Sequence, residues 1–243
     1  GKDVALANKE TLVMAGEIMT REQRSRGTRL LPIDSEHCAL HQCLVSRDPG
    51  GVSKLWLTAS GGPFRTRPAS TFGEITVEEA LNHPTWRMGR KISIDSATLM
   101  NKALEIIEAH WLFGIPGDRI DVVVHPQSVV HSMVEFKDGT VLAQLGRTDM
   151  RIPIQYALTY PEVWDTPLQP MDLGTAFSLG FEPPDHARFK SLGLAQEALA
   201  RGGTTPAAMN AANEVAVQAF LDGEIPFPGI TEIVSDVVLK HVP

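Results

Sequence analysis

Apolar residues near the start of the chain form two short blocks separated by a longer amphipathic stretch. The blocks cover residues 3–7 and 30–33, and residues 9–19 between them repeat apolar side chains at intervals of three and four. Short apolar blocks are typical of buried strands, and the longer spacing is typical of a helix. Strand, helix and strand in this order predict the last unit of a parallel α/β sheet.

The middle of the chain predicts a mixed sheet. Residues 53–59 form a strand that runs into Ser60-Gly61-Gly62-Pro63, where two glycines and a proline end regular structure in a loop. Residues 121–124 predict another buried strand, and residues 133–145 predict a hairpin about Asp138-Gly139. A hairpin is antiparallel, so we expect parallel and antiparallel strands in one sheet.

One long helix is predicted between these strands. It covers residues 96–113, with Ser96 or Asp95 as its N-cap, and Gly114 followed by Pro116 ends it.

Proline spacing marks a boundary later in the chain. Five prolines lie within residues 160–185, a spacing that suits a linker lying over a surface, and helical patterns follow over residues 192–199 and 207–221. We therefore expect an α/β protein. Its parts are the end of a Rossmann-like domain (1–33), an α+β catalytic domain with a mixed sheet (34–159), a linker (160–185) and a small helical domain that ends before it is complete (186–243).

Composition narrows the class of protein. The 243 residues carry 29 acidic and 22 basic side chains, a formal charge of −7 at pH 7, with no basic tract, which argues against nucleic acid as a partner. No apolar run approaches the roughly 20 residues of a membrane helix. We therefore expect a soluble protein. Cys38 and Cys43 are too few for a disulfide framework, which favours a reducing compartment, the cytoplasm. Gly1 is not an initiator Met, which predicts a piece of a longer protein.

Two acidic residues follow the second apolar block. Asp34 and Glu36 are two positions apart, and on an extended backbone their carboxylates project to one side and can share a divalent cation. Two carboxylates supply only about half of the protein ligands that a divalent-cation site needs. The alternative is a solvated loop or a helix cap, which is the commoner role of such a pair.

The predicted helix over residues 96–113 carries a second set of polar side chains. Ser96 would lie at its positive dipole end, a position that suits a phosphate, and Asn101 and Lys102 follow on the next turn. Glu105 lies four residues after Asn101, on the same face, where it would meet a cation held by Asp34 and Glu36. An ordinary amphipathic helix with a solvated Asn-Lys-Glu face is the alternative.

Two loops add weaker signals. Ser60 and the glycines after it offer a hydroxyl and backbone amides that would close over the same phosphate. His83 and Trp86 lie in an irregular stretch that suits a lid over a small substrate, although a surface loop is an equal alternative. His125 and His131 are six residues apart, which is not the spacing of a helical metal pair, and we assign neither to a metal.

Nine short motifs in fixed order resemble the 1-deoxy-D-xylulose 5-phosphate reductoisomerase family, and they span nearly the whole chain. The motifs are Leu6-Ala7-Asn8-Lys9-Glu10, Asp34-Ser35-Glu36-His37, Ser60-Gly61-Gly62-Pro63-Phe64, His83-Pro84-x-Trp86, Met88-Gly89-Arg90-Lys91-Ile92-Ser93, Asp95-Ser96-Ala97-Thr98, Met100-Asn101-Lys102, His125-Pro126-Gln127-Ser128 and Asn210-Ala211-Ala212-Asn213-Glu214. No motif residue is substituted. The resemblance implies that residues 1–33 end a nucleotide-binding domain.

The resemblance also implies roles for individual residues. The metal ligands for Mg²⁺ or Mn²⁺ would be Asp34, Glu36 and Glu105. The substrate contacts would be Lys9, Ser35, Glu36, Ser60, His83, Ser96, Asn101, Lys102 and Glu105, with Ser60, His83, Ser96, Asn101 and Lys102 at the phosphate. The catalytic set would be Asp34, Glu36, Glu105, Lys9, His83 and Trp86, and the cofactor contacts Asn8, Glu10 and Gly89.

The family reaction needs NADPH, a divalent metal and a phosphosugar, and it rearranges and reduces 1-deoxy-D-xylulose 5-phosphate to 2-C-methyl-D-erythritol 4-phosphate, an isoprenoid precursor. The resemblance also implies a homodimer. One departure is the absence of any G-x-G-x-x-G motif, so the main NADPH-binding part is not in this chain. Two alternatives remain: a metal-dependent sugar-phosphate isomerase or aldolase without nicotinamide, and an inactive phosphosugar-binding fragment.

Overall fold

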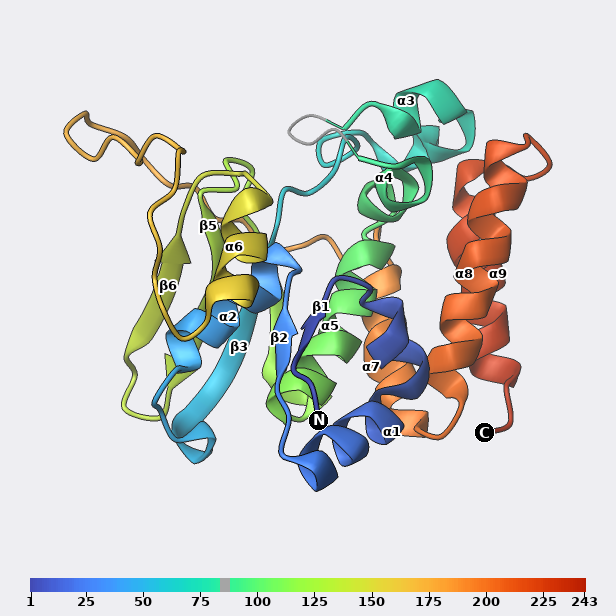
Figure 1. The fold of residues 1–243 in the computed structure, drawn as a ribbon. Helices are drawn as coiled ribbons and strands as arrows, with labels where there is room; N and C mark the ends of the chain where they lie inside the picture. Colours follow the sequence, from blue (N-terminus) through green and yellow to red (C-terminus); the bar gives the residue numbers. More distant parts are fainter. Residues whose placement is uncertain (84–87) are drawn as a thin grey trace.

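The first unit of the fold is a pair of parallel strands joined by a helix. The computed structural model describes residues 1–83 and 88–243 (Figure 1). Strand β1 (Val4–Leu6) pairs in parallel with β2 (Leu30–Pro32), and α1 (Glu10–Arg26) connects them. The helix ends at Gly27, whose φ of +59° is a left-handed conformation that glycine adopts without strain. The predicted strand–helix–strand unit is confirmed.

The second sheet has four strands in the order β4-β3-β5-β6. Strands β3 (Val52–Ala59) and β4 (Ile120–Val124) are parallel, whereas β5 (Val130–Phe136) is antiparallel to β3 and to β6 (Val141–Leu145). The sheet is therefore mixed, as predicted. The hairpin turn also lies where expected, because Gly139 has a φ of +86° and its N–H donates to the carbonyl of Phe136.

Helices cover this sheet and connect it to the rest of the chain. The short helix α2 (Ser35–Leu44) packs on β5 and β6, and α6 (Arg151–Thr159) lies beside it (Figure 1). Helix α5 (Met100–Phe113) packs against β3, β4, α1 and α7. Shorter elements complete this part. They are the 3₁₀ turns at Pro49–Gly51, Ala69–Glu74 and Gly117–Arg119, helix α3 (Val77–Leu81) and helix α4 (Arg90–Ala97).

The single helix predicted over residues 96–113 is wrong. Helix α4 ends at Ala97, and α5 begins at Met100 after Leu99, which has a φ of +58°. The Thr98 hydroxyl lies at the break: it donates toward the Ile94 carbonyl at 3.1 Å and accepts from the Met100 N–H at 3.3 Å. Both helices bury apolar side chains, so the pattern of apolar residues continues across the break and hides it.

The segment with five prolines has little regular structure. Residues 160–185, all of which the structure describes, contain no helix and join the sheet through one isolated bridge between Val124 and Glu182. Much of the segment projects from the fold as a loop (Figure 1). Its returning end is held by His125, whose ring stacks on Phe181 at 4.7 Å between centroids and whose Nδ1 lies 2.8 Å from the Gly180 carbonyl oxygen.

Three helices form the end of the described chain. They are α7 (Ser191–Arg201), α8 (Thr205–Leu221) and α9 (Phe227–Lys240). The first two fall where the sequence predicts helices, and α9 was not predicted. Buried apolar residues of these helices belong to the same continuous core as those of α5 and β3. None of the described helices is long and apolar enough to cross a membrane.

One lysine connects three helices that are far apart in sequence. The Lys91 ammonium, at the start of α4, lies 3.1 Å from Glu10 of α1, 2.9 Å from Asp95 of α4 and 3.1 Å from Glu214 of α8. Asp95 is 1% exposed and also accepts a hydrogen bond from Asn213 of α8 at 2.8 Å. This polar cluster fixes α1 and α8 against α4.

Candidate active site

A cavity of about 320 Å³ lies where α1, α2, α4 and α5 meet the end of β3. Most of the residues that line it are charged or polar. Its lining residues are Ala7, Lys9, Ile33, Asp34, Ser35, Glu36, Thr58, Ser60, His83, Met88, Ile92, Ser96, Asn101, Lys102, Glu105, Ser128, His131 and Met150. The cavity thus brings together all the residues, among those described, that the sequence analysis assigned to metal or substrate.

Three carboxylates converge at one end of this cavity. Asp34, Glu36 and Glu105 each place an oxygen within 4.8 Å of the others. The local backbone differs from the expectation, because residues 34–36 are not extended. Asp34 is the residue before α2, and Glu36 lies in the first turn of that helix. The helix start, rather than strand alternation, directs both carboxylates toward Glu105 on α5.

Two lysines lie among the carboxylates. The Lys9 ammonium is 2.5 Å from Asp34 and 3.2 Å from Glu105. The Lys102 ammonium is 2.5 Å from Glu105 and also pairs with Glu36. All five side chains are largely buried, and Glu105 is only 1% exposed. Three carboxylates face two ammonium groups, so the cluster keeps one excess negative charge.

The electrostatics of the cluster favour ionised lysines. Burial opposes the charged form of each lysine, but Asp34 and Glu105 raise the pKa of Lys9 well above its ordinary value, and Glu105 and Glu36 raise that of Lys102. Burial opposes ionisation of Asp34, yet Lys9 holds its pKa well below its usual range. Burial and then the charge of Glu36 raise the pKa of Glu105. Glu105 is thus the most buried of the three carboxylates, and its pKa stays raised although it contacts both lysines.

The donor set fits a hard divalent cation. All three converging groups are carboxylates, and oxygen donors of this kind suit Mg²⁺ and Mn²⁺. Burial and then the neighbouring Glu36 carboxylate raise the pKa of Glu105, and a bound cation would offset both effects. The residues present therefore fit the metal that the sequence analysis expected.

Hydroxyl, imidazole and amide groups also line the cavity. The Ser60 hydroxyl lies 3.1 Å from Nε2 of His83 and accepts from the Gly62 N–H at 3.2 Å. Burial lowers the pKa of His83, which favours a neutral ring. Asn101 lies within the charged cluster, since its amide oxygen accepts from Lys9 at 2.8 Å and its amide nitrogen donates to Glu105 at 2.5 Å. The Ser60 hydroxyl, the His83 ring and the Asn101 amide nitrogen can each donate a hydrogen bond to an anionic ligand.

The predicted position of Ser96 at a helix N-terminus is wrong. Ser96 lines the cavity, but it lies in the last turn of α4, where the helix dipole is negative. The nearby helix N-terminus belongs to α5 at Met100. An anion in this cavity would be met by the start of α5, which carries Asn101 and Lys102.

The residues expected to contact a nicotinamide cofactor do not line the cavity, but each is next in sequence to a residue that does. Asn8 is exposed and caps the start of α1 by accepting from the Thr11 N–H at 3.0 Å. Glu10 pairs with Lys91, and Gly89 is exposed at the start of α4 with open space beside it. Trp86 lies outside the described residues. Asn8 and Gly89 are thus open to solvent.

Sequence reasoning missed two buried groups behind the carboxylates. His37 and Glu108 are both fully buried, and with Asp34 they form a second cluster whose ligand atoms lie within 4.8 Å of one another. Against the effect of burial, Glu108 raises the pKa of His37 to about 9, and burial raises the pKa of Glu108 to about 7. Glu108 follows Glu105 by three residues, a helical spacing that places both on one side of α5 and was a usable signal.

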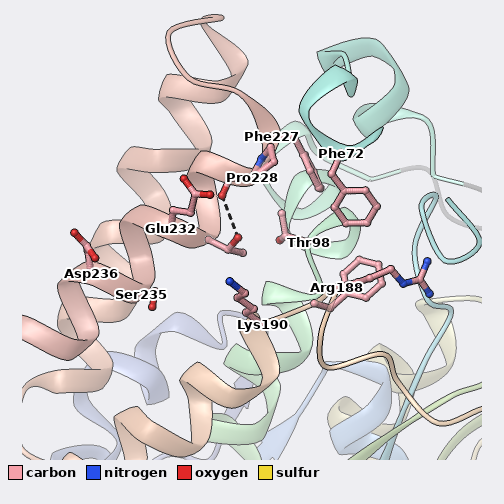
Figure 2. Close-up of a pocket in the computed structure, with 11 residues that line it drawn as sticks. Phe72, Thr98, Arg188, Lys190, Phe227, Pro228, Glu232, Ser235 and Asp236 are labelled. Atoms are coloured by element: carbon pink, nitrogen blue, oxygen red, sulfur yellow. Dashed lines mark hydrogen bonds between the residues drawn. The ribbon is translucent and has the colours of Figure 1, made fainter. Parts of the chain in front are cut away.

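A second cavity of about 240 Å³ lies elsewhere, between α9, the start of α7 and the turn at Ala69–Glu74 (Figure 2). Aromatic rings of Phe72 and Phe227 line one side, and Glu232, Ser235 and Asp236 of α9 line another. None of its lining residues belongs to the carboxylate cluster. Only two carboxylates, Glu232 and Asp236, are among its lining residues, so it does not offer the three converging carboxylates of the first cavity, and we assign no chemistry to it.

Comparisons with known proteins agree with this geometry. Residues 30–113 match the family model of the 1-deoxy-D-xylulose 5-phosphate reductoisomerase C-terminal domain, and residues 145–242 match that of the DXP reductoisomerase C-terminal domain. The proteins of that name from Symbiobacterium thermophilum and Chloroherpeton thalassium are 60% and 59% identical, over 100% and 99% of this chain. In both cases the chain covers 62% of the relative's length.

Solved structures are similar over the same region. The Zymomonas mobilis reductoisomerase in complex with NADPH has a TM-score of 0.93 and 49% identity, over 99% of this chain and 62% of that one. A DOX-P reductoisomerase in complex with NADPH, fosmidomycin and magnesium has a TM-score of 0.93 and 47% identity, over 99% of this chain and 61% of that one. The chain therefore belongs to the 1-deoxy-D-xylulose 5-phosphate reductoisomerase family, of which it spans about three fifths of the usual length.

Proposed function

We propose that this chain carries the metal and phosphosugar site of an enzyme that converts 1-deoxy-D-xylulose 5-phosphate to 2-C-methyl-D-erythritol 4-phosphate with NADPH and a divalent metal. The observation that carries the proposal is the single cavity in which Asp34, Glu36 and Glu105 meet Lys9 and Lys102. Family membership gives the reaction, and the cavity supplies the groups that the reaction needs.

Asp34, Glu36 and Glu105 would hold Mg²⁺ or Mn²⁺, which when bound stabilises negative charge on neighbouring substrate oxygens. Lys9 is fixed between Asp34 and Glu105 by ion pairs of 2.5 and 3.2 Å, so its ammonium is oriented before substrate arrives. An ammonium held in this way can donate a hydrogen bond to a substrate hydroxyl or carbonyl oxygen. Ser35, which also lines the cavity, would contact the substrate beside it.

The phosphate of the substrate would lie at the other end of the cavity. Ser60, His83, Ser96, Asn101 and Lys102 all line the cavity and offer hydroxyl, imidazole, amide and ammonium donors. Anchoring the phosphate would align the reacting carbons with the carboxylate end, so that binding energy far from the reaction lowers the barrier.

The chain would contribute only part of the cofactor site. Asn8, Glu10 and Gly89 are next in sequence to residues that line the cavity and would contact NADPH, which supplies hydride when bound. The sequence contains no glycine-rich diphosphate turn. Trp86 is proposed to cover the site and lies outside the described residues.

We further propose that the protein is a cytoplasmic homodimer in which the sheet edge and the loop after α6 are covered. Strand β6 is an edge strand with Val141 50% exposed and Leu145 40% exposed. In the loop, Val163 is 94% exposed and Leu173 69% exposed. A free strand edge beside exposed apolar side chains favours pairing with another chain. Sedimentation equilibrium that gives a monomer at micromolar concentration would contradict this.

The test of the main proposal combines binding and turnover. Calorimetric titration with fosmidomycin, the ligand of a related structure, is expected to show binding that depends on added Mn²⁺. Glu105→Gln should abolish the metal dependence, and the exposed Glu232→Gln serves as the matched control. In parallel, NADPH oxidation is followed by absorbance with 1-deoxy-D-xylulose 5-phosphate as substrate. Fosmidomycin binding that is equally tight with a chelator present would contradict the proposed site.

A further inference from the structure

Glu108 is a buried carboxylate that the proposed reaction does not use. It is fully buried on α5, one turn after Glu105. Within the described part of the chain, neither of its carboxylate oxygens has a hydrogen-bond partner. A carboxylate buried in this way is costly unless a nearby charge or polar group compensates it. The polar group that faces it is therefore informative.

That group is His37, which connects Glu108 to Asp34. Its Nδ1 lies 3.4 Å from a carboxylate oxygen of Glu108 and 3.8 Å from one of Asp34. Its Nε2 lies 2.9 Å from the main-chain carbonyl of Glu105, and because a carbonyl only accepts, Nε2 donates. The ring also stacks on Phe113 with 6.4 Å between centroids. The orientation of His37 is thus fixed from two sides, and its remaining nitrogen faces both carboxylates.

We propose that Glu108 and His37 are positioning residues, which hold the Asp34 carboxylate in the orientation in which it meets Glu36 and Glu105. Neither would touch the cation or the substrate. Groups behind the ligands of a metal site orient those ligands, and their loss typically weakens metal binding by about 10–100-fold. The inference rests on the proposed cation site and extends it by one layer of side chains.

A purely structural role is the main alternative. In that case Glu108 and His37 would only fill space between α2 and α5, and their replacement would change stability without changing metal affinity. A second alternative follows from the cluster of Asp34, His37 and Glu108, whose ligand atoms lie within 4.8 Å of one another and offer donors for a second ion. The number of ions bound separates that alternative from ours.

The experiment is a titration of the full chain with Mn²⁺, in which free Mn²⁺ is followed by electron paramagnetic resonance. The unsubstituted chain is expected to bind one ion. Glu108→Gln keeps the shape of the side chain and should weaken Mn²⁺ binding by roughly 10–100-fold with the stoichiometry unchanged. Glu232→Gln, an exposed glutamate on α9, is the matched control and should bind as the unsubstituted chain does.

A double substitution shows whether Glu108 acts through His37. His37→Gln alone should weaken Mn²⁺ binding, and it provides the same test if Glu108→Gln does not fold. In the double variant the second substitution should add little, because residues that act in series are not additive. Additive losses would overturn the proposal, as would unchanged affinity with a lower melting temperature, or two ions in the unsubstituted chain. If the unsubstituted chain binds no Mn²⁺, the proposed cation site itself is wrong. If it binds one ion and Glu108→Gln binds that ion as tightly, only the positioning role is wrong.

Discussion

The charged cluster around Glu105 and the core-facing side of the α7–α9 helices both contain buried side chains, but the first are charged and the second are apolar. Lys9, Lys102 and Glu105 are 6%, 5% and 1% exposed, while Met209 of α8 and Ile230 of α9 are fully buried. Apolar burial stabilises the folded state in proportion to the area removed from water. Buried ion pairs return little net stability, because desolvation offsets their attraction. We therefore expect the apolar helices to contribute most of the stability, and the charged cluster to contribute to ligand binding more than to stability.

The largest expected effect tests the apolar side of this comparison. Ile230→Ala removes a fully buried side chain from α9 and should lower the free energy of unfolding by about 2–5 kcal/mol, because it leaves a cavity. Mn²⁺ affinity of the folded chain should not change. Urea unfolding followed by circular dichroism measures the first quantity, and a loss of metal affinity in the folded variant would show that the two regions are not separate.

The next effect tests the charged side. Glu105→Gln should weaken Mn²⁺ binding by at least about 100-fold, because it removes a proposed ligand. A 100-fold loss of affinity corresponds to about 2.7 kcal/mol of binding free energy. Unfolding of the metal-free chain should change little, because burial already raises the pKa of Glu105 and each lysine keeps another carboxylate. Calorimetry and urea unfolding test the two parts. A stability loss as large as that of Ile230→Ala would break the comparison.

A smaller effect is expected at the phosphate end. Lys102→Met should weaken binding of a phosphonate ligand such as fosmidomycin by roughly 10–100-fold, the range for loss of one hydrogen bond between charged groups. The matched control is Lys190→Met, an exposed lysine at the second cavity (Figure 2). Competition with inorganic phosphate identifies the site, and equal weakening in both variants would contradict a specific role for Lys102.

The smallest expected effect is the contribution of a histidine outside the charged cluster to the pH dependence of the free energy of unfolding. His41 on α2 lies 2.7 Å from the Tyr156 hydroxyl, and burial lowers its pKa. The folded chain therefore binds this proton less readily than the unfolded chain, whose His pKa is about 6.5. The contribution of neutral His41 to the free energy of unfolding is therefore fully present above about pH 6.5, and it is lost as the pH falls through the lower pKa of the folded state. Urea unfolding at pH 7.5 and 5.0 should show a smaller loss in His41→Gln than in the unsubstituted chain.

The sequence predicted elements whose signals are local. The β3 strand ends at Ala59 in the loop expected from the two glycines, and the hairpin turns at Gly139. It did not predict the break at Leu99, because apolar periodicity continues through a single residue of positive φ. It also predicted an extended backbone for residues 34–36, since an N-terminal helical turn and the end of a strand carry similar polar residues.

The members of the site were predictable, but their arrangement was not. Resemblance to a family named Lys9 as a substrate contact, yet its contact with Glu105 joins residues 96 positions apart. Such a contact depends on how α1 packs on α5, which no spacing along the chain encodes. The pairing of His37 with Glu108 is missed for the same reason, although Glu108 shares a side of α5 with Glu105.

The loop that projects after α6 also determines how the chain responds to a protease. Leu173 and Phe177 are 69% and 53% exposed there, so an enzyme that cleaves after large apolar residues should cut this loop first. The pieces on either side would remain together, because α7 packs on α5 and His125 holds the returning end at Gly180 and Phe181. A nicked chain should therefore show two bands on a denaturing gel and a single particle in solution.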